Sequence, residues 1–230
     1  MNTRIQWLLS AFLLSITCTV TEAAIFVNYS GFVVDSSGAG IPNATAQVWV
    51  GTFTSGFNVS ANAGDLNALF AHWEPFPAVG DSTSTANTTS FGAPGHFAQS
   101  ASLAGDPTSF LGQKIYLWAF ETGNAAAPNT TTWNNVSQYG LFYNPTDSLW
   151  TFPSSAPVTD DFHVIDSSQS GLTAVNSSWG SINTSYPLPS SGFSSGSLQL
   201  APVPEPAECA FAIGVGLLAF AAYRRFGAKA

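Results

Sequence analysis

Positive charge is the scarcest property of this sequence of 230 residues, which holds only five Lys and Arg residues in total. Four of the five lie close to the two ends of the chain. Between Ala24 and Val203, Lys114 alone stands against ten acidic residues, so this stretch carries a net charge of −9. A surface of this kind repels phosphate groups. The sequence therefore excludes nucleic acids and anionic membrane surfaces as partners.

Cysteine is almost as rare, because the chain has only Cys18 and Cys209. Both lie in apolar segments near the ends, so the stretch between them can form neither a disulfide framework nor a cysteine metal site. The three histidines show no spacing typical of metal ligands. We therefore predict no metal site and no cofactor, and we expect the middle of the chain to depend on its hydrophobic core.

The first residues, MNTRIQWLLSAFLLSITCTVTEAA, predict a secretory signal peptide over 1–23. Arg4 supplies the positive start, a short apolar run follows, and small residues at Thr21 and Ala23 suit a signal peptidase. Cleavage is expected between Ala23 and Ala24. The apolar run is too short to favour a first transmembrane helix.

The last residues have three parts in a fixed order. Pro204, Glu205 and Pro206 come first, an apolar helix is expected over about 207–223, and Arg224 and Arg225 end it. An apolar run of this length is at the short limit for a membrane span. The positive-inside rule places the arginines in the cytoplasm and the preceding domain outside.

This pattern resembles the PEP-CTERM sorting signal of Gram-negative bacteria, and the resemblance covers the segment 204–230 only. It implies recognition by an exosortase, a membrane-bound, transpeptidase-like cysteine protease that removes or exchanges such tails. It also implies a transient anchor in the inner membrane, delivery to the cell surface or the extracellular space, and an association with exopolysaccharide and biofilm matrix. It implies nothing about the activity of the domain itself.

The middle of the chain predicts an all-β domain over 24–186. Runs rich in β-branched and aromatic residues alternate with turns rich in Gly, Pro, Asn and Ser. The expected strands are 25–35, 44–53, 95–105, 113–121, 138–144, 148–153 and 161–166. Many short strands of this kind are typical of an antiparallel β-sandwich or jelly roll. The first two, separated by DSSGAG, are expected to form a hairpin.

One helix is expected among the strands. Asp65 can cap its start, and Leu66, Leu69, Phe70 and Trp73 share one helical face. It is long enough to plug one end of a sandwich. A connector rich in Pro, Ser and Gly follows over 187–203, with a further candidate strand at about 197–201.

Three enzyme or metal motifs occur in the domain and the connector, and none predicts a catalytic residue. Ser194 lies in a Gly-x-Ser-x-Gly pattern, but the flanking strand, the helix and a downstream histidine of a hydrolase are missing. Glu74 and Glu121 could serve as a glycosidase pair only if the fold brings them together. The acidic group Asp160, Asp161 and Asp166 could bind calcium, although a solvated loop is the preferred interpretation.

We therefore expect an exported, non-enzymatic protein of the surface or matrix, with a structural or adhesive role. A carbohydrate-binding module for matrix polysaccharide is the alternative, and a secreted glycoside hydrolase is a weaker one. Sugar binding predicts a flat row of exposed aromatic residues, for which Tyr116, Trp118, Trp133 and Tyr139 are candidates in principle. The core is expected to need most of these residues, so we assign no binding site to them. Hydrolysis predicts two carboxylates facing each other across a cleft.

Overall fold

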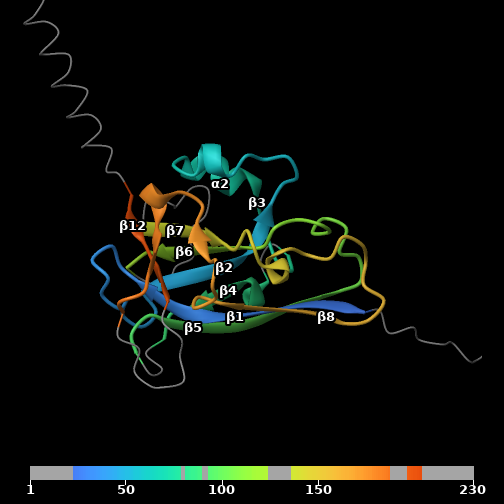
Figure 1. Ribbon diagram of the computed structural model, residues 1–230, viewed down its shortest axis with the longest axis horizontal. Helices are drawn as coiled ribbons and strands as arrows, with labels where there is room; N and C mark the ends of the chain where they lie inside the picture. The colour runs from blue at the N-terminus through green and yellow to red at the C-terminus, as the bar shows by residue number, and fades with distance from the viewer. Residues whose placement is uncertain (1–22, 79–80, 90–92, 124–135, 187–195, 204–230) are drawn as a thin grey trace, which may run out of the picture.

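A computed structural model describes residues 23–78, 81–89, 93–123, 136–186 and 196–203, which form two β-sheets and one α-helix (Figure 1). The strands are β1 (Ala24–Val34), β2 (Ala46–Phe53), β3 (Trp73–Pro75), β4 (Thr85–Asn87), β5 (His96–Ala104), β6 (Tyr116–Glu121), β7 (Gln138–Tyr143), β8 (Asp161–Asp166), β9 (Thr173–Ala174), β10 (Ser181–Asn183), β11 (Ser197–Gln199) and β12 (Ala201–Pro202). The helix is α2 (Leu66–His72), and the 3-10 turns are η1 (Ser60–Asn62), η2 (Ser82–Ser84), η4 (Ser148–Trp150) and η5 (Ser177–Trp179). The predicted all-β class with one short helix is confirmed.

The first sheet has the order β10-β11-β1-β5, and β8 also pairs with β1. The second has the order β12-β7-β6-β2-β3, with β4 on β2 and β9 on β7. The prediction of a purely antiparallel arrangement is wrong. β1 runs antiparallel to β5 but parallel to both β8 and β11. Strands of the second sheet lie in the sequence between β1 and each parallel partner. Neither β8 nor β11 is therefore joined to β1 by a tight turn, which would require an antiparallel pair.

The expected hairpin between the first two strands is also wrong, because β1 and β2 belong to different sheets. The turn itself forms: Asp35 Oδ1 accepts hydrogen bonds from the backbone N–H groups of Ser37 and Ala39, and Val34 makes a single bridge with Gly40. The ladder then stops close to Pro42, which has no N–H to donate. The chain crosses to the other sheet, where β2 pairs with β6.

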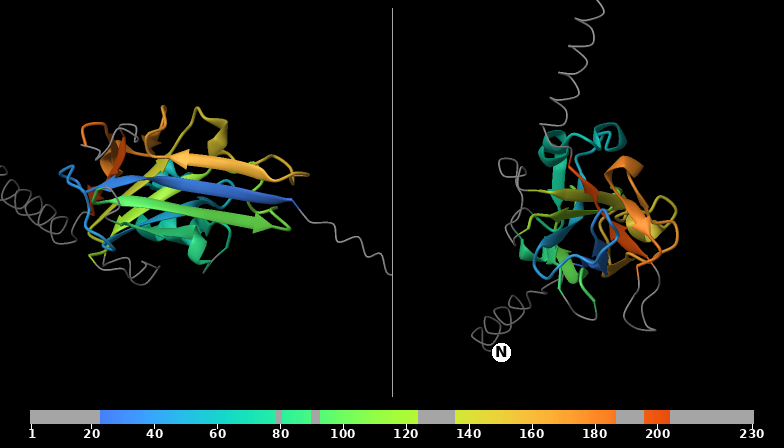
Figure 2. Two further views of the ribbon diagram at one scale, coloured as in Figure 1. Left: turned by 90° about the horizontal axis from the view of Figure 1, so that it is seen from below. Right: turned by 90° about the vertical axis from the view of Figure 1, so that its left-hand side faces the viewer.

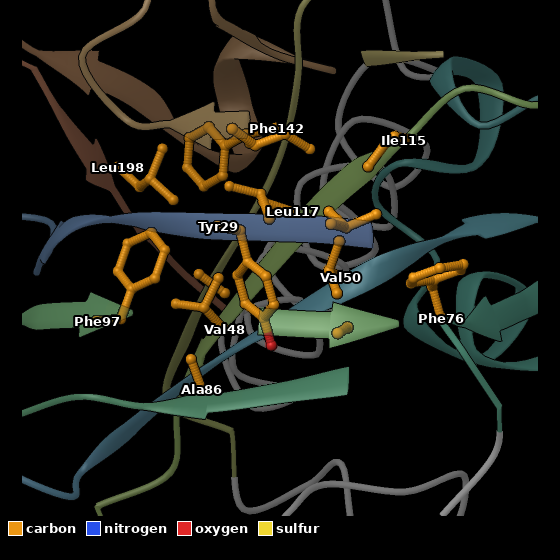
Figure 3. Close-up of a cluster of buried hydrophobic side chains, with 14 of the residues drawn as sticks. Tyr29, Val48, Val50, Phe76, Ala86, Phe97, Ile115, Leu117, Phe142 and Leu198 are labelled. Carbon is orange, nitrogen blue, oxygen red and sulfur yellow. The ribbon is translucent and has the colours of Figure 1, made fainter. Parts of the chain in front are cut away.

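The main core lies between the two sheets (Figure 3). Tyr29 and Phe97 come from the first sheet, whereas Val48, Leu117 and Phe142 come from the second. Each of these five side chains is at most 1% exposed. The contacts across this layer hold the two sheets together, since burial of large apolar side chains is the main favourable contribution to folding.

The second sheet is buried on both of its faces. Along β6, Leu117 and Ala119 point into the main core, whereas Trp118 and Phe120 point into a second cluster on the outer side. The helix α2 covers this outer side (Figure 1) and contributes Leu66, Leu69 and Phe70 to the second cluster. The predicted helix is therefore present, with Asp65 accepting from Ala68 N at 3.0 Å, but it ends at His72. Trp73, which was expected on its apolar face, begins β3 and pairs with Phe53 of β2. The helix covers a sheet face, however, and does not plug one end of the sandwich.

Two further segments differ from or refine the expectations. The strand expected over 148–153 is wrong, because Asp147 accepts from Leu149 N at 2.9 Å and caps the 3-10 turn η4 there. The candidate strand at 197–201 is present as two short strands, β11 and β12. Since β11 pairs with β1 and β12 with β7, this end of the predicted connector is held in both sheets.

Candidate functional site

The outer face of the first sheet carries the exposed apolar side chains of Phe162 and Val164, and we call it the β1–β5–β8 face. Figure 2 (left) shows its three long strands lying side by side, with β1 between β8 and β5. The register pairs Phe26 of β1 with Phe162 of β8 and with Ser102 of β5. In the same way it pairs Asn28 with Val164 and with Ser100. Because side chains two residues apart share one face of a strand, these six residues form two adjacent rows.

An aromatic pair lies at one end of this face. The rings of Phe26 and Phe162 are stacked, with centroids 4.7 Å apart and an interplanar angle of 8°. Directly opposite positions on neighbouring strands bring their side chains close enough for this contact. Phe162 is still 53% exposed, and so is Val164 in the next row. Phe26 covers one ring face of Phe162, so the exposed part of Phe162 includes its other face.

The remaining positions of the face are small and polar. Ser100 donates to the side-chain oxygen of Asn28, and Ser30 donates to Asp166 Oδ2 at 3.1 Å. Ala98, Ser100, Ser102 and Ala104 on β5 are all exposed. The face therefore combines the large apolar side chains of β8 with the small side chains of β5, which present hydroxyl and methyl groups.

The free edge of β8 is closed by one side chain. Gln169 Nε2 donates to the carbonyl oxygen of Val164 at 3.0 Å, while its Oε1 accepts from Asp166 N at 3.1 Å. The same Oε1 accepts from Trp150 Nε1 at 2.8 Å. The amide of Gln169 thus takes the place that a neighbouring strand would occupy, a device that protects edge strands from pairing with other chains.

Three of the aromatic residues predicted for sugar binding do not lie on any surface. Trp118 and Tyr139 are at most 1% exposed and Tyr116 is 9% exposed, because all three pack under α2 in the second cluster. Burial raises the pKa of Tyr116 to about 12, with a smaller contribution from Tyr143. Trp133 lies outside the described residues. These three side chains therefore belong to the core, as expected for most of the aromatic residues, and none of them can contribute to a sugar-binding row.

The two candidate glutamates are far apart. Glu74 pairs with Thr52 and Glu121 pairs with Ala46, so the two lie opposite positions of β2 that are six residues apart. At roughly 3.3 Å per residue this is about 20 Å along the strand. That separation is much larger than the roughly 5 to 9.5 Å that glycoside hydrolysis needs. The fold does not bring this pair together.

The acidic group near β8 is also spread out. Asp160 Oδ1 accepts from Ala24 N at 3.0 Å, Asp161 Oδ2 lies 3.3 Å from His163 Nε2, and Asp166 accepts from Ser30. Each carboxylate has its own partners, and Asp161 and Asp166 stand at opposite ends of the strand. Within the described ranges, no three His, Cys, Asp or Glu side chains are grouped so that they could hold a metal ion.

The segments that carry the export and sorting predictions are mostly beyond the described part of the chain. Ser194, residues 1–22 and the tail from Pro204 through Arg224 and Arg225 lie outside it. Among the residues that are described, no helix is long and apolar enough to cross a membrane. Ala23 and Ala24 are described, and Ala24 begins β1.

The sequence reasoning missed Phe26 and Phe162. In DFHVID, both alternating sets contain apolar residues, so the pattern did not indicate which set faces the core. The structure buries His163, whose Nδ1–H donates to the carbonyl oxygen of Leu149 at 2.8 Å, and exposes Phe162. His163 also packs against Phe152, and Ile165 on the same side of β8 is fully buried in the main core, so contacts outside β8 accompany this orientation.

Comparison with protein-family models, with curated proteins and with solved structures found no match for this chain. The fold and the β1–β5–β8 face therefore carry the functional argument, together with the motifs at the two ends of the sequence.

Proposed function

We propose that this chain is an exported, non-enzymatic protein of the cell surface or extracellular matrix, with a structural or adhesive role. Its domain is a single, jelly-roll-like β-sandwich. One observation carries the proposal: a signal peptide over 1–23 and a complete PEP-CTERM pattern at Pro204–Pro206, 207–223 and Arg224–Arg225 occur at opposite ends of one chain. In this proposal signal peptidase cuts at Ala23–Ala24, the tail is held briefly in the inner membrane, and an exosortase processes it.

The fold removes one catalytic alternative. Glu74 and Glu121 lie about 20 Å apart along β2, too far for a glycosidase pair. A surface built mainly from Ser, Thr, Asn and Gly, with a net charge of −9 over 24–203, suits a protein that stays dissolved in a hydrated matrix.

The sorting step is tested by replacing Pro204, Glu205 and Pro206 with alanine in a host that has an exosortase. We expect the altered chain to remain in the membrane fraction with its C-terminal tail intact, whereas the unaltered chain loses the tail and reaches the surface or medium. Replacement of Pro187 and Pro189 by alanine is the matched control, because it removes prolines outside the triplet. Unchanged processing of the triplet variant contradicts the proposal.

A second candidate function is that of a carbohydrate-binding module for matrix polysaccharide. The specific observation in its favour is the stack of Phe26 and Phe162, with Phe162 53% exposed, beside hydroxyl and amide groups on the same sheet face. It is compatible with export and sorting, since it assigns a ligand to the delivered domain.

A further inference from the structure

We propose that the β1–β5–β8 face binds a neutral polysaccharide chain, with Phe26 and Phe162 as its aromatic anchor. This inference deepens the proposed function and rests on it for the source of the ligand, the exopolysaccharide around the cell. The ligand lies across the rows formed by Phe162, Phe26 and Ser102 and by Val164, Asn28 and Ser100.

The aromatic anchor provides the apolar part of the contact. A pyranose ring presents C–H groups on its faces, and these pack against aromatic rings through dispersion and burial of apolar area. Phe162 offers the ring face that Phe26 does not cover, and it is 53% exposed. Because Phe26 fixes the orientation of this ring from the other side, binding restricts little further side-chain motion.

The polar groups beside the anchor provide hydrogen bonds. Ser100 and Asn28 bond to each other in the row next to the aromatic pair, and Ser102 lies beside Phe26. Hydroxyl and amide groups can both donate and accept, so they suit sugar hydroxyl groups. The small side chains along β5 leave these groups accessible to a chain that lies flat on the sheet.

The charge of the domain selects neutral ligands. Lys114 is the only lysine or arginine between Ala24 and Val203, and it lies in the second sheet region, over the ring of Tyr143. Asp166 on the face accepts hydrogen bonds from Ser30 and Ser168, and the exposed Asp160 just before β8 accepts from Ala24 N. A polysaccharide with carboxylate or sulfate groups would meet repulsion and no cation to offset it.

A second copy of the chain is the competing occupant of this face. Strand pairing through β8 is opposed by Gln169, which occupies the edge at Val164 and Asp166. Packing face to face would bury few apolar groups, namely Phe26, Phe162 and Val164, whereas stable interfaces bury about 800 Å² per partner. Polysaccharide binding needs a smaller contact and uses the hydroxyl groups that a protein partner would have to desolvate.

The test is cosedimentation of the full chain, in mild detergent, with insoluble cellulose, β-1,3-glucan and chitin, and affinity electrophoresis in gels that contain alginate. We expect retention on at least one neutral polymer and none on alginate. Phe162→Ser should weaken retention about tenfold, the loss expected for an aromatic anchor. Val158→Ser is the matched control, because Val158 is 95% exposed and lies outside the face.

The outcomes separate the two proposals. Retention that is the same for Phe162→Ser as for the unaltered chain, absence of retention on all neutral polymers, or preference for alginate overturns the inference. A concentration-dependent dimer that Phe162→Ser abolishes would assign the face to a second copy instead. None of these results depends on sorting, so failure of the triplet experiment and failure of this one are distinguishable. Circular dichroism of Phe162→Ser and Phe26→Ser verifies that each variant is folded.

Discussion

The side-chain amide of Gln169 is hydrogen-bonded to the outer edge of β8, where its Nε2 donates to the carbonyl oxygen of Val164 at 3.0 Å. Its Oε1 accepts both from the backbone N–H of Asp166 and from the indole N–H of the buried Trp150. Gln169 thus protects the edge of β8 and also provides the acceptor for the indole N–H of Trp150. It therefore connects the edge of β8 to a residue of the main core.

Gln169→Ala should therefore destabilise the domain and promote self-association. The variant loses three hydrogen bonds and leaves the indole N–H of Trp150 without its partner, which should cost about 2–4 kcal/mol of unfolding free energy. Urea denaturation measures this loss, and light scattering over a range of concentrations measures association. Gln113→Ala, at a half-buried glutamine away from β8, is the control. A Gln169→Ala protein as stable and as monomeric as that control would contradict the assignment.

The attachment of α2 to the second sheet gives another expectation. Leu69 is fully buried in the outer cluster with Trp118, so Leu69→Ala leaves a cavity there. Large-to-small changes at such sites cost about 2–5 kcal/mol. Thermal and urea unfolding measure this cost, and Ala71→Ser on the exposed side of the same helix should change stability by less than about 1 kcal/mol. If both variants unfold alike, α2 does not cover the sheet as described.

Local signals in the sequence were sufficient to predict α2. The cap at Asp65 and the spacing of Leu66, Leu69 and Phe70 are contained within a few residues, and the structure has a helix there, although Trp73 belongs to β3. Its position could not be predicted in the same way. In β6, Tyr-Leu-Trp-Ala-Phe is apolar on both alternating sides, and only the fold shows that one side faces the main core and the other faces α2.

The pairing of β1 and the position of the candidate site depend on contacts between distant residues. The turn after Asp35 is local and forms as expected, but the ladder beyond it ends near Pro42, and the strand that follows pairs elsewhere. Phe162 lies on the outer side of β8, whereas His163 and Ile165 point inward, to the carbonyl oxygen of Leu149 and to the main core. A residue pattern cannot reveal a partner that the folded chain supplies from another segment.

Acidification should lower the stability of the domain through His96. Burial lowers the pKa of His96 below its ordinary value, and the charge of Asp166 offsets part of this effect. Between the pKa of the folded state and the ordinary value of about 6.5, the unfolded chain binds more protons. The unfolding free energy therefore falls as pH decreases through this window, and it is fully retained above about 6.5.

Urea denaturation at a series of pH values from about 7.5 to 5 measures this dependence. His96→Gln should reduce the loss of stability on acidification. His72→Gln, on α2 beyond the second sheet, is the control and should retain the part that His96 contributes. An unchanged pH dependence in His96→Gln would show that the burial of this imidazole does not affect stability.

Removal of the signal peptide should change one contact at the start of β1. The backbone nitrogen of Ala24 donates to Asp160 Oδ1 at 3.0 Å, and Ala24 becomes the first residue if cleavage follows Ala23. The amide N–H is then replaced by a charged ammonium group that faces the same carboxylate, and charge-assisted hydrogen bonds are stronger than neutral ones. Because Asp160 is exposed, Asp160→Asn should lower the unfolding free energy of the cut chain by up to about 1 kcal/mol.

The same substitution should lower the unfolding free energy less in an uncut chain in which Ala23→Phe blocks cleavage. Urea denaturation of both forms, with N-terminal sequencing to identify Ala24, measures the difference. Asp147→Asn, which alters the cap of η4, should cost both forms equally. Equal losses for Asp160→Asn in the cut and uncut chains would show that cleavage creates no ion pair at this position.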